Sequence, residues 1–335
     1  MKIIKFAIVG CGAIGSRHVS VICNEKMAEL VAVCDKDEEK CKKISSEHNN
    51  IPYYTSYKKM LDCVKVDIVD VCTPNFLHAK MSIDAMNKGN NVLVEKPLSL
   101  TASDSKKMIA TAKKNKVKLF VVKQNRFNRP VAFVQKLIAE NKLGKILMIN
   151  TNVLWNRNNE YYSKSDWRGK IKLEGGSLYT QASHFVDLLI WWCGDVVSAK
   201  TTIATKNHKI ETEDCGVSIL KFKKGGLGLI EWTTCIYEKN YEGSITIIAE
   251  KGTIKIGGQY LNKIEYWNVE SIPCPDPSVI EENKIYERDK GTKSNHDLVI
   301  SNYISILNNN GGELVGGEEG IKTIEAIEKI YKSSK

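Results

Sequence analysis

Apolar and polar positions along the first 122 residues follow two alternating patterns. Short β-branched runs predict strands at Lys5–Val9, Leu30–Cys34, Ile68–Cys72, Val92–Glu95 and Lys118–Val122. Between them, segments of helical length predict helices at Gly15–Asn24, Glu38–His48, His78–Lys88 and Ala102–Asn115. Strands that alternate with helices of this length are typical of βαβ units around a parallel sheet. The pattern therefore predicts a doubly wound α/β domain over residues 1–122.

A different pattern begins at residue 123. It predicts helices at Val131–Asn141 and Ser177–Trp192, and strands at Ile146–Trp155, Val197–Ala204, Gly216–Phe222, Gly228–Thr234, Ser244–Ala249 and Gly252–Ile256. Successive strands separated by Gly or charged turns predict a large, mainly antiparallel open sheet. Ser271–Lys293 predicts a long surface loop, and Ser301–Asn309 and Gly320–Tyr331 predict closing helices. Residues 123–335 are thus expected to form an α+β domain, whose closing helices can pack back on the first domain.

Composition agrees with a two-domain globular protein. The chain has 335 residues, of which 42% are hydrophobic and 26% charged, whereas one domain usually takes ~150 residues. No apolar stretch approaches the roughly 18 residues of a membrane span, and the run at Phe6–Val9 is too short for a signal peptide. The ten cysteines are scattered without a C-x-x-C motif, which fits a reducing compartment. We therefore expect a cytoplasmic protein with no metal site and no membrane contact.

The positive charge of the chain has a simple explanation. Lys and Arg number 49 against 39 Asp and Glu, a net charge of +10, which raises nucleic acid as a partner. The lysines, however, are spread over helical segments such as residues 106–116, and no aromatic-interleaved binding motif accompanies them. A solvated lysine face is the better interpretation, so we expect no nucleic-acid partner.

A glycine motif opens the first βαβ unit. Gly10-x-Gly12-x-x-Gly15 follows a predicted strand and precedes a helix, where glycines permit a tight turn and the helix N-terminus binds a pyrophosphate. Asp35 ends the second strand, 25 positions after Gly10, where a carboxylate can accept both ribose hydroxyls and repels a 2′-phosphate. The pattern favours NAD over NADP; the alternative is that Asp35 only caps the next helix.

Two further motifs follow strands of the first domain. Thr73-Pro74-Asn75-x-x-His78 and Glu95-Lys96-Pro97 should both lie at the carboxyl edge of the parallel sheet, where doubly wound folds bind ligands. A lysine at this edge can hydrogen-bond a substrate hydroxyl and share in its deprotonation. Lys96 is therefore a candidate catalytic residue.

Together with Gly175-Gly176-(x)7-His184-x-x-Asp187, these motifs resemble the Gfo/Idh/MocA family of NAD(P)-dependent sugar oxidoreductases over almost the whole chain. The resemblance implies an N-terminal Rossmann domain that binds NAD and a C-terminal substrate and oligomerisation domain, whose open sheet face packs on a neighbour in a dimer or tetramer. Carried over by motif, the cofactor-binding residues are Gly10, Gly12, Ala13, Ile14, Asp35, Thr73, Asn75, His78, Glu95, Lys96 and Gln124.

A finer resemblance lies in residues 119–126, 160–162, 167–169, 181–184, 242–246 and 250–253. These segments are similar to the branch that oxidises UDP-2-acetamido-2-deoxyglucuronate at C3, in bacterial pathways to diacetamido-uronic acids of surface polysaccharides. The resemblance implies that Lys96 and His184 are catalytic and flank the sugar hydroxyl and the nicotinamide ring. Which of the two accepts the proton stays open. Many relatives have an aspartate one helical turn before the histidine, whereas this chain has Thr180.

The few arginines point to an anionic substrate. Five of six, at positions 17, 126, 129, 157 and 168, lie next to the motifs, and guanidinium groups suit bidentate recognition of carboxylate and phosphate. Arg168 is the strongest candidate because it shares a loop with aromatic residues. The expected substrate-binding residues are Lys96, Arg126, Tyr161, Arg168, Thr180, Gln181 and His184.

Other interpretations stay open at this point. The chain can oxidise another sugar or a cyclitol such as inositol, although the arginine cluster is then harder to explain. It can also be a non-catalytic NAD-binding sensor, against which the presence of both Lys96 and His184 argues. For Tyr161, covering the domain junction is as good an interpretation as binding a sugar, and His184 alone would read as a core histidine.

Overall fold

The computed structural model describes residues 2–280, 294–312 and 315–334. Its contacts divide the chain into two compact units. The N-terminal unit comprises residues 1–124 and 286–321, and the C-terminal unit comprises residues 125–285 and 322–335. In sequence order, the second segment of the N-terminal unit therefore comes after most of the C-terminal unit.

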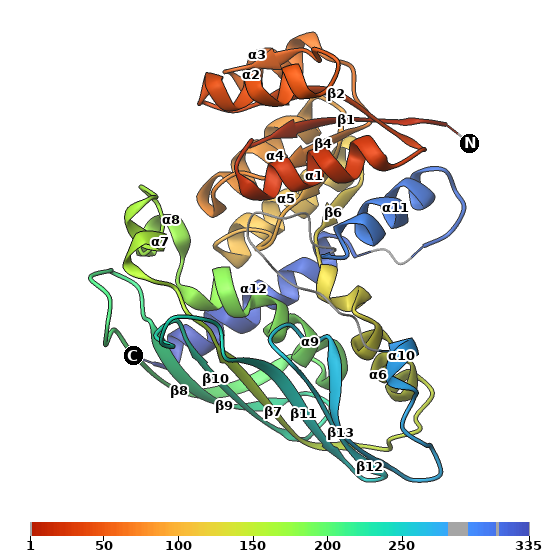
Figure 1. Ribbon diagram of the computed structural model, residues 1–335, viewed down its shortest axis with the longest axis vertical. Helices are drawn as coiled ribbons and strands as arrows, with labels where there is room; N and C mark the ends of the chain where they lie inside the picture. The colour runs from red at the N-terminus through yellow and green to blue at the C-terminus, as the bar shows by residue number, and fades with distance from the viewer. Residues whose placement is uncertain (1, 281–293, 313–314, 335) are drawn as a thin grey trace. The chain divides into compact units, whose positions relative to one another are not determined.

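The N-terminal unit has a six-stranded parallel sheet in the order β3-β2-β1-β4-β5-β6, which confirms the doubly wound fold (Figure 1). Its strands are β1 (Ile4–Val9), β2 (Ala28–Cys34), β3 (Tyr53–Tyr54), β4 (Ile68–Val71), β5 (Asn91–Val94) and β6 (Leu119–Val121). Its helices are α1 (Ala13–Asn24), α2 (Glu38–Glu47), α3 (Tyr57–Cys63), α4 (His78–Asn87), α5 (Ala102–Asn115) and α11 (His296–Leu307). The strand order reverses between β1 and β4, the switch point where such sheets bind ligands.

Local sequence explains why these helices begin where they do. The Asp37 side chain accepts a hydrogen bond from the backbone N–H of Lys40 at the start of α2, and Thr101 caps α5 in the same way. The pair β3 and α3 was not predicted, because a two-residue strand at the sheet edge has no apolar period to detect.

The helix α11 packs on the Rossmann-type sheet far from it in sequence. It begins at His296, earlier than the predicted Ser301, and contacts α1. The Tyr303 hydroxyl donates to the Val121 carbonyl at 2.7 Å, and its ring stacks on Phe120 at 4.3 Å. Of the predicted loop at 271–293, residues 281–293 lie outside the described residues, and the rest contains the short helix α10 (Pro277–Ile280).

The C-terminal unit is built on a seven-stranded sheet in the order β13-β12-β11-β7-β10-β9-β8 (Figure 1). The strands are β7 (Ile146–Leu154), β8 (Val196–Ala204), β9 (Cys215–Phe222), β10 (Leu227–Thr233), β11 (Glu242–Ala249), β12 (Gly252–Gly257) and β13 (Lys263–Val269). Five neighbouring pairs are antiparallel, as predicted, and β7 pairs with β10 in parallel. The described helices include α6 (Arg129–Ala139), α7 (Asn159–Ser163), α8 (Ile171–Glu174) and α9 (Ser183–Cys193), together with the part of α12 (Gly317–Lys332) that begins at residue 322.

One face of this sheet is packed and the other is open. Along β9 the side chains alternate between buried and exposed positions, and α9 contacts the sheet through β7. Val217, Ile219 and Leu227 remain exposed on the opposite face. Strict alternation is what a half-covered antiparallel sheet requires. Within the described ranges no helix is both long and apolar enough to cross a membrane.

Candidate functional site

The glycine turn between β1 and α1 uses each glycine for a different reason. At Gly10, φ is +103° and an added Cβ would lie 2.5 Å from the Cys72 carbonyl oxygen. At Gly15 an added Cβ would overlap the Gly10 carbonyl oxygen. At Gly12 an added Cβ would meet nothing within 4 Å, and this residue caps α1 without a side-chain partner for the helix N–H groups. The turn therefore leaves an open, uncapped helix N-terminus that fits a pyrophosphate.

Asp35 lies beside this turn at the end of β2. Its Oδ2 accepts the backbone N–H of Cys11 at 2.7 Å, and its Oδ1 accepts that of Asp37 at 2.9 Å. The residue that caps α2 is Asp37, so the alternative that Asp35 is only the helix cap is wrong. Its carboxylate is half-buried at the edge of the open turn, where it fits the ribose hydroxyls of an adenosine half.

The loops after β4 and β5 are joined by His78. The Nε2 of this buried ring lies 2.8 Å from the Thr73 carbonyl oxygen, and its Nδ1 lies 2.6 Å from that of Pro97. Burial lowers the pKa of His78, and the two carbonyl oxygens of Pro97 and Thr73 oppose this shift without reversing it. The buried Asn75 begins the short 3₁₀ helix Asn75–Leu77 that leads into α4. The ring therefore links the Thr73 loop after β4 to Pro97, the residue that follows Lys96.

Glu95 points into the core of the unit. Its Oε1 accepts from His18 at 3.1 Å and from His296 at 3.2 Å, and its Oε2 accepts the backbone N–H of Lys96 at 3.0 Å. Sequence reasoning missed His18 and His296, although His18 lies only three residues after the last glycine of the motif. The predicted contact of Glu95 with a cofactor stays a prediction.

In the C-terminal unit, His184 stands at the start of α9 directly after a stretch of π-helix, Leu178–Ala182. This stretch contains Thr180 and Gln181, and π-helical turns occur frequently at functional sites. The Gly176 backbone that leads into it has φ +128°, and an added Cβ there would collide with the Tyr331 hydroxyl. The absence of a side chain at Gly176 thus lets the backbone pack closely against Tyr331 of α12, shortly before His184.

A buried carboxyl group lies next to Thr180. Glu174 is buried, and its Oε2 accepts the backbone N–H of Gly169 at 2.5 Å. Burial raises the pKa of Glu174, while hydrogen bonds from Gly169 and the Thr180 hydroxyl oppose the shift. Thr180 therefore contributes a neutral hydroxyl group that lies next to the carboxyl group of Glu174.

Arg126 has an internal partner. Its Nε and Nη2 donate to the two carboxylate oxygens of Asp187 at 2.8 and 2.9 Å, and both side chains are buried. The guanidinium also lies 4.5 Å over the Trp191 ring. Asp187 of the histidine motif is thus used to hold Arg126, and the predicted role of Arg126 in binding substrate stays a prediction.

Arg168 has a different environment. Its guanidinium lies 4.1 Å over the ring of Tyr161 and 5.4 Å over that of Trp167, and its Nη1 donates to the Tyr161 carbonyl oxygen at 3.3 Å. Among the described residues no carboxylate forms a salt bridge with it, and its Nε is buried without a hydrogen-bond partner. The Gln181 amide donates to the Tyr161 hydroxyl at 2.9 Å. Arg168, Tyr161 and Gln181 therefore form one cluster, with a guanidinium suited to an anion.

The structure brings the predicted cofactor residues from the glycine turn, β2, β4 and β5 to one edge of the parallel sheet. Lys96 and Gln124 belong to the N-terminal unit and His184 to the C-terminal unit, so the pairing of Lys96 with His184 stays a prediction. Within the described residues, His18, Glu95 and His296 are one of three groups with potential metal-ligating atoms within 4.8 Å of one another.

Comparison with known proteins agrees with this architecture. The family profile described as "Oxidoreductase family, NAD-binding Rossmann fold" matches residues 4–123, and "Oxidoreductase family, C-terminal alpha/beta domain" matches residues 135–335. The glucose-6-phosphate 3-dehydrogenase of Bacillus subtilis is 24% identical over 98% of this chain and 95% of its own.

Two solved structures are more similar. The WlbA dehydrogenase from Bordetella pertussis, in complex with NADH and UDP-GlcNAcA, is 35% identical with a TM-score of 0.89, covering 100% of this chain and 97% of that chain. The corresponding enzyme from Chromobacterium violaceum, in complex with the same two ligands, is 36% identical with a TM-score of 0.91, covering 100% and 94%. The chain belongs to the Gfo/Idh/MocA family of oxidoreductases, with an NAD-binding Rossmann domain at its N-terminus.

Proposed function

We propose that this protein is an NAD-dependent dehydrogenase that oxidises the C3 hydroxyl of UDP-2-acetamido-2-deoxyglucuronate (UDP-GlcNAcA) to the 3-keto sugar. The observation that carries the proposal is the full-length similarity to two dehydrogenases whose structures hold NADH and UDP-GlcNAcA. Other relatives named as 3-dehydrogenases act on glucosides and on glucose 6-phosphate. Oxidation at C3 is therefore supported more broadly than the nucleotide part of the substrate.

The cofactor assignment is supported by residues of the glycine turn. The uncapped N-terminus of α1 offers N–H groups to a pyrophosphate, and Gly12 leaves the space above them open. Asp35, already fixed by two backbone N–H groups, favours ribose hydroxyls over a 2′-phosphate. NAD is thus preferred to NADP.

In the proposed reaction, the C3–H and O–H bonds of the alcohol break and a C=O bond forms. When bound, NAD accepts the hydride from C3. Lys96 and His184 take up and hold the hydroxyl proton, which leaves as a free proton once the ketone has formed. The protein mainly contributes positioning and electrostatics, because the cofactor carries the redox chemistry.

The substrate anion is assigned to the cluster of Arg168, Tyr161 and Gln181. The Arg168 guanidinium forms no salt bridge among the described residues and lies over two aromatic rings, so it is preorganised for a carboxylate or diphosphate. A free cyclitol has no anionic group with which the Arg168 guanidinium could pair. Thr180 and His184 belong to the same stretch of backbone as Gln181 and complete the proposed substrate side of the site.

The cellular setting is also part of the proposal. All ten cysteines are free, which agrees with a cytoplasmic enzyme, and the substrate places it in biosynthesis of a diacetamido-uronic acid for surface polysaccharide. The exposed apolar residues on the open sheet face, Val217, Ile219 and Leu227, support a homo-oligomer, a dimer or a tetramer, that covers this face.

The test is NADH formation by the purified protein with NAD and UDP-GlcNAcA, compared with UDP-2-acetamido-2-deoxyglucose and myo-inositol. We expect reduction of NAD with the nucleotide uronate alone. Reduction of NAD with inositol alone would overturn the proposed substrate. Lys96→Met should abolish turnover and leave NAD affinity nearly unchanged; equal loss of both would overturn the catalytic role of Lys96. Bound NAD without reduction by any substrate would instead favour the sensor interpretation.

A further inference from the structure

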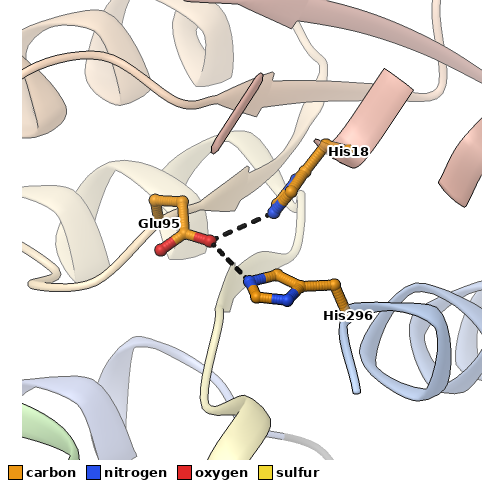
Figure 2. Close-up of side chains that lie close together, drawn as sticks. All are labelled: His18, Glu95 and His296. Carbon is orange, nitrogen blue, oxygen red and sulfur yellow. Dashed lines mark hydrogen bonds and ion pairs between the residues drawn. The ribbon is translucent and has the colours of Figure 1, made fainter. Parts of the chain in front are cut away.

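A buried chain of polar side chains crosses the core of the N-terminal unit beneath Lys96. The Nδ1 of His18 lies 2.7 Å from Asp70 Oδ2, and its Nε2 lies 3.1 Å from Glu95 Oε1. His296 reaches the same Glu95 oxygen from α11, with its Nε2 at 3.2 Å (Figure 2). All four residues are at most 4% exposed. They come from α1, β4, the end of β5 and α11, so the chain joins four elements.

The partners of His18 fix its protonation state. Both of its ring nitrogens face carboxylate oxygens, and an ionised carboxylate only accepts hydrogen bonds, so this geometry favours a proton on each nitrogen. Although burial alone would lower it, the Asp70 carboxylate holds the pKa of His18 well above its usual range. The Cys72 thiol, 3.6 Å from Nδ1, also faces the ring. A neutral His18 would leave two carboxylates unbalanced in a dry interior, which is costly.

The partners of His296 assign it the opposite state. Its Nε2 donates to Glu95, and its Nδ1 accepts from the Ser294 hydroxyl at 2.6 Å, so one proton satisfies both nitrogens. Burial lowers the pKa of His296. The Glu95 carboxylate opposes this shift, and the positive charges of His18 and Arg17 reinforce it. His296 is therefore a neutral donor to Glu95.

Glu95 connects the two histidines to the backbone of Lys96. Although burial alone would raise it, the two imidazole donors hold the pKa of Glu95 well below its usual range. One carboxylate oxygen is used by the histidines and the other accepts the Lys96 backbone N–H. On the other side of Lys96, the Pro97 carbonyl lies 2.6 Å from His78. The backbone around the lysine is thus held from both sides.

We propose that His18 and His296 are positioning residues for Lys96: a doubly protonated His18 and a neutral His296 orient the Glu95 carboxylate, which holds the Lys96 backbone. The catalytic role of Lys96 in this inference rests on the proposed function. His296 begins α11, which contacts α1 in the N-terminal unit although it lies far from it in sequence. The lysine of the N-terminal domain would therefore become fully positioned only once this C-terminal segment has docked.

The charge state is tested without any substrate. In the full-length protein labelled with ¹⁵N-histidine, long-range ¹H–¹⁵N spectra between pH 6 and 9 distinguish imidazolium from neutral imidazole, with His18→Gln and His296→Gln used for assignment. His18 should stay doubly protonated across the range and His296 should stay neutral. A neutral His18 at pH 7 would overturn the proposal, as would a stoichiometric transition metal in place of the shared protons.

The positioning role is tested by two substitutions at one site. The Gln amide of His296→Gln can still donate to Glu95, whereas His296→Leu cannot. Because small misplacements of a catalytic group can cost on the order of 10²-fold in rate, His296→Leu should lower kcat by at least ~10-fold with KM for NAD changed less than ~3-fold. His296→Gln should restore most of kcat, and His48→Gln, outside the cluster, is the control.

The outcomes separate the two hypotheses. Equal loss in both His296 variants, or a rise in KM for NAD alone, would overturn the positioning role. If His296→Leu does not fold, the wild-type spectra still test the charge states, and the kcat of His296→Gln still tests the positioning role. A wild-type protein that does not oxidise UDP-GlcNAcA overturns the proposed function and leaves the spectroscopic test of the cluster intact.

Discussion

The two glycines Gly12 and Gly15 should respond to alanine in opposite ways, because one faces open space and the other faces backbone. At Gly12 the φ of −74° suits alanine, and an added Cβ meets no atom within 4 Å. At Gly15 the added Cβ would lie 1.8 Å from the Gly10 carbonyl oxygen, with the Gly10 carbonyl carbon at 2.9 Å. Contacts between real Cβ atoms and backbone do not come this close, so at Gly15 either α1 or the turn must move.

The expected magnitudes follow from these contacts. For Gly12→Ala, a small loss at the helix cap and a small gain from the less flexible unfolded chain nearly cancel, so the free energy of unfolding should change by less than ~0.5 kcal/mol. The methyl group would, however, occupy the space above the helix N–H groups and weaken NAD binding by at least ~10-fold, about 1.4 kcal/mol. For Gly15→Ala, backbone displacement should cost about 1–3 kcal/mol of stability.

Both quantities are directly measurable. Urea denaturation gives the free energy of unfolding of each variant, and isothermal titration with NAD gives the affinity under conditions where both variants are folded. The wild-type protein and His48→Gln serve as references, because His48 lies outside the glycine turn and outside the expected cofactor-binding residues. A Gly12→Ala variant with wild-type affinity would refute the placement of the pyrophosphate, and a Gly15→Ala variant of wild-type stability would refute the steric argument.

Three further predictions concern charged groups. Asp35→Asn should lower NAD affinity and narrow the preference for NAD over NADP, measured as the ratio of kcat/KM values; unchanged discrimination would contradict the ribose contact. Asp187→Asn should cost about 3–5 kcal/mol in urea denaturation because it leaves the buried Arg126 unpaired, and the double variant Asp187→Leu/Arg126→Met should recover much of this loss. Although burial alone would raise it, backbone N–H groups lower the pKa of Asp214 to about 2. Its ionised form therefore stabilises the fold above its unfolded pKa near 4, so the stability difference between wild type and Asp214→Asn should shrink as pH falls from 5 towards 2.

The N-terminal fold was predictable because its signals are local. Each long strand is an apolar run, and the glycine turn is a contiguous motif whose steric needs at Gly10 and Gly15 can be stated from sequence and are met in the structure. Strand ends also fix the carboxyl edge, which is why Asp35 and Lys96 fall at one edge of one sheet. Periodicity and motif position were sufficient for these features.

Other features depend on contacts between distant segments. The strand β13 was missed because Lys263–Val269 is largely exposed and carries charge, so it shows no strand-like apolar run. The π-helical stretch Leu178–Ala182 resembles an ordinary helix in sequence. The parallel pairing of β7 with β10 follows from the excursion through α7–α9, β8 and β9 between them, which no local pattern encodes.

Arg126 illustrates why residue type alone did not assign its role. Its position beside a motif and the rarity of arginine both favoured a substrate contact, yet its guanidinium is used twice inside the protein, by the Asp187 carboxylate and by the Trp191 ring. Arg168 has the same chemistry and the same kind of sequence context, but no described carboxylate forms a salt bridge with it. The two arginines differ only in what folding places beside them.

The same reasoning explains why the histidine cluster was invisible in the sequence. Residues 18, 70, 95 and 296 share no spacing, and a histidine on an apolar helix face is usually a satisfied core residue. Only the fold places an imidazole between two carboxylates, and that geometry leaves the ring with two protons. Burying this charge is costly unless carboxylates balance it. One of the two carboxylates that face the ring is Glu95, which also accepts the Lys96 backbone N–H. Apolar side chains of similar volume could meet a purely structural need, whereas ion pairs that end at the Lys96 backbone agree with the positioning proposed above for this lysine.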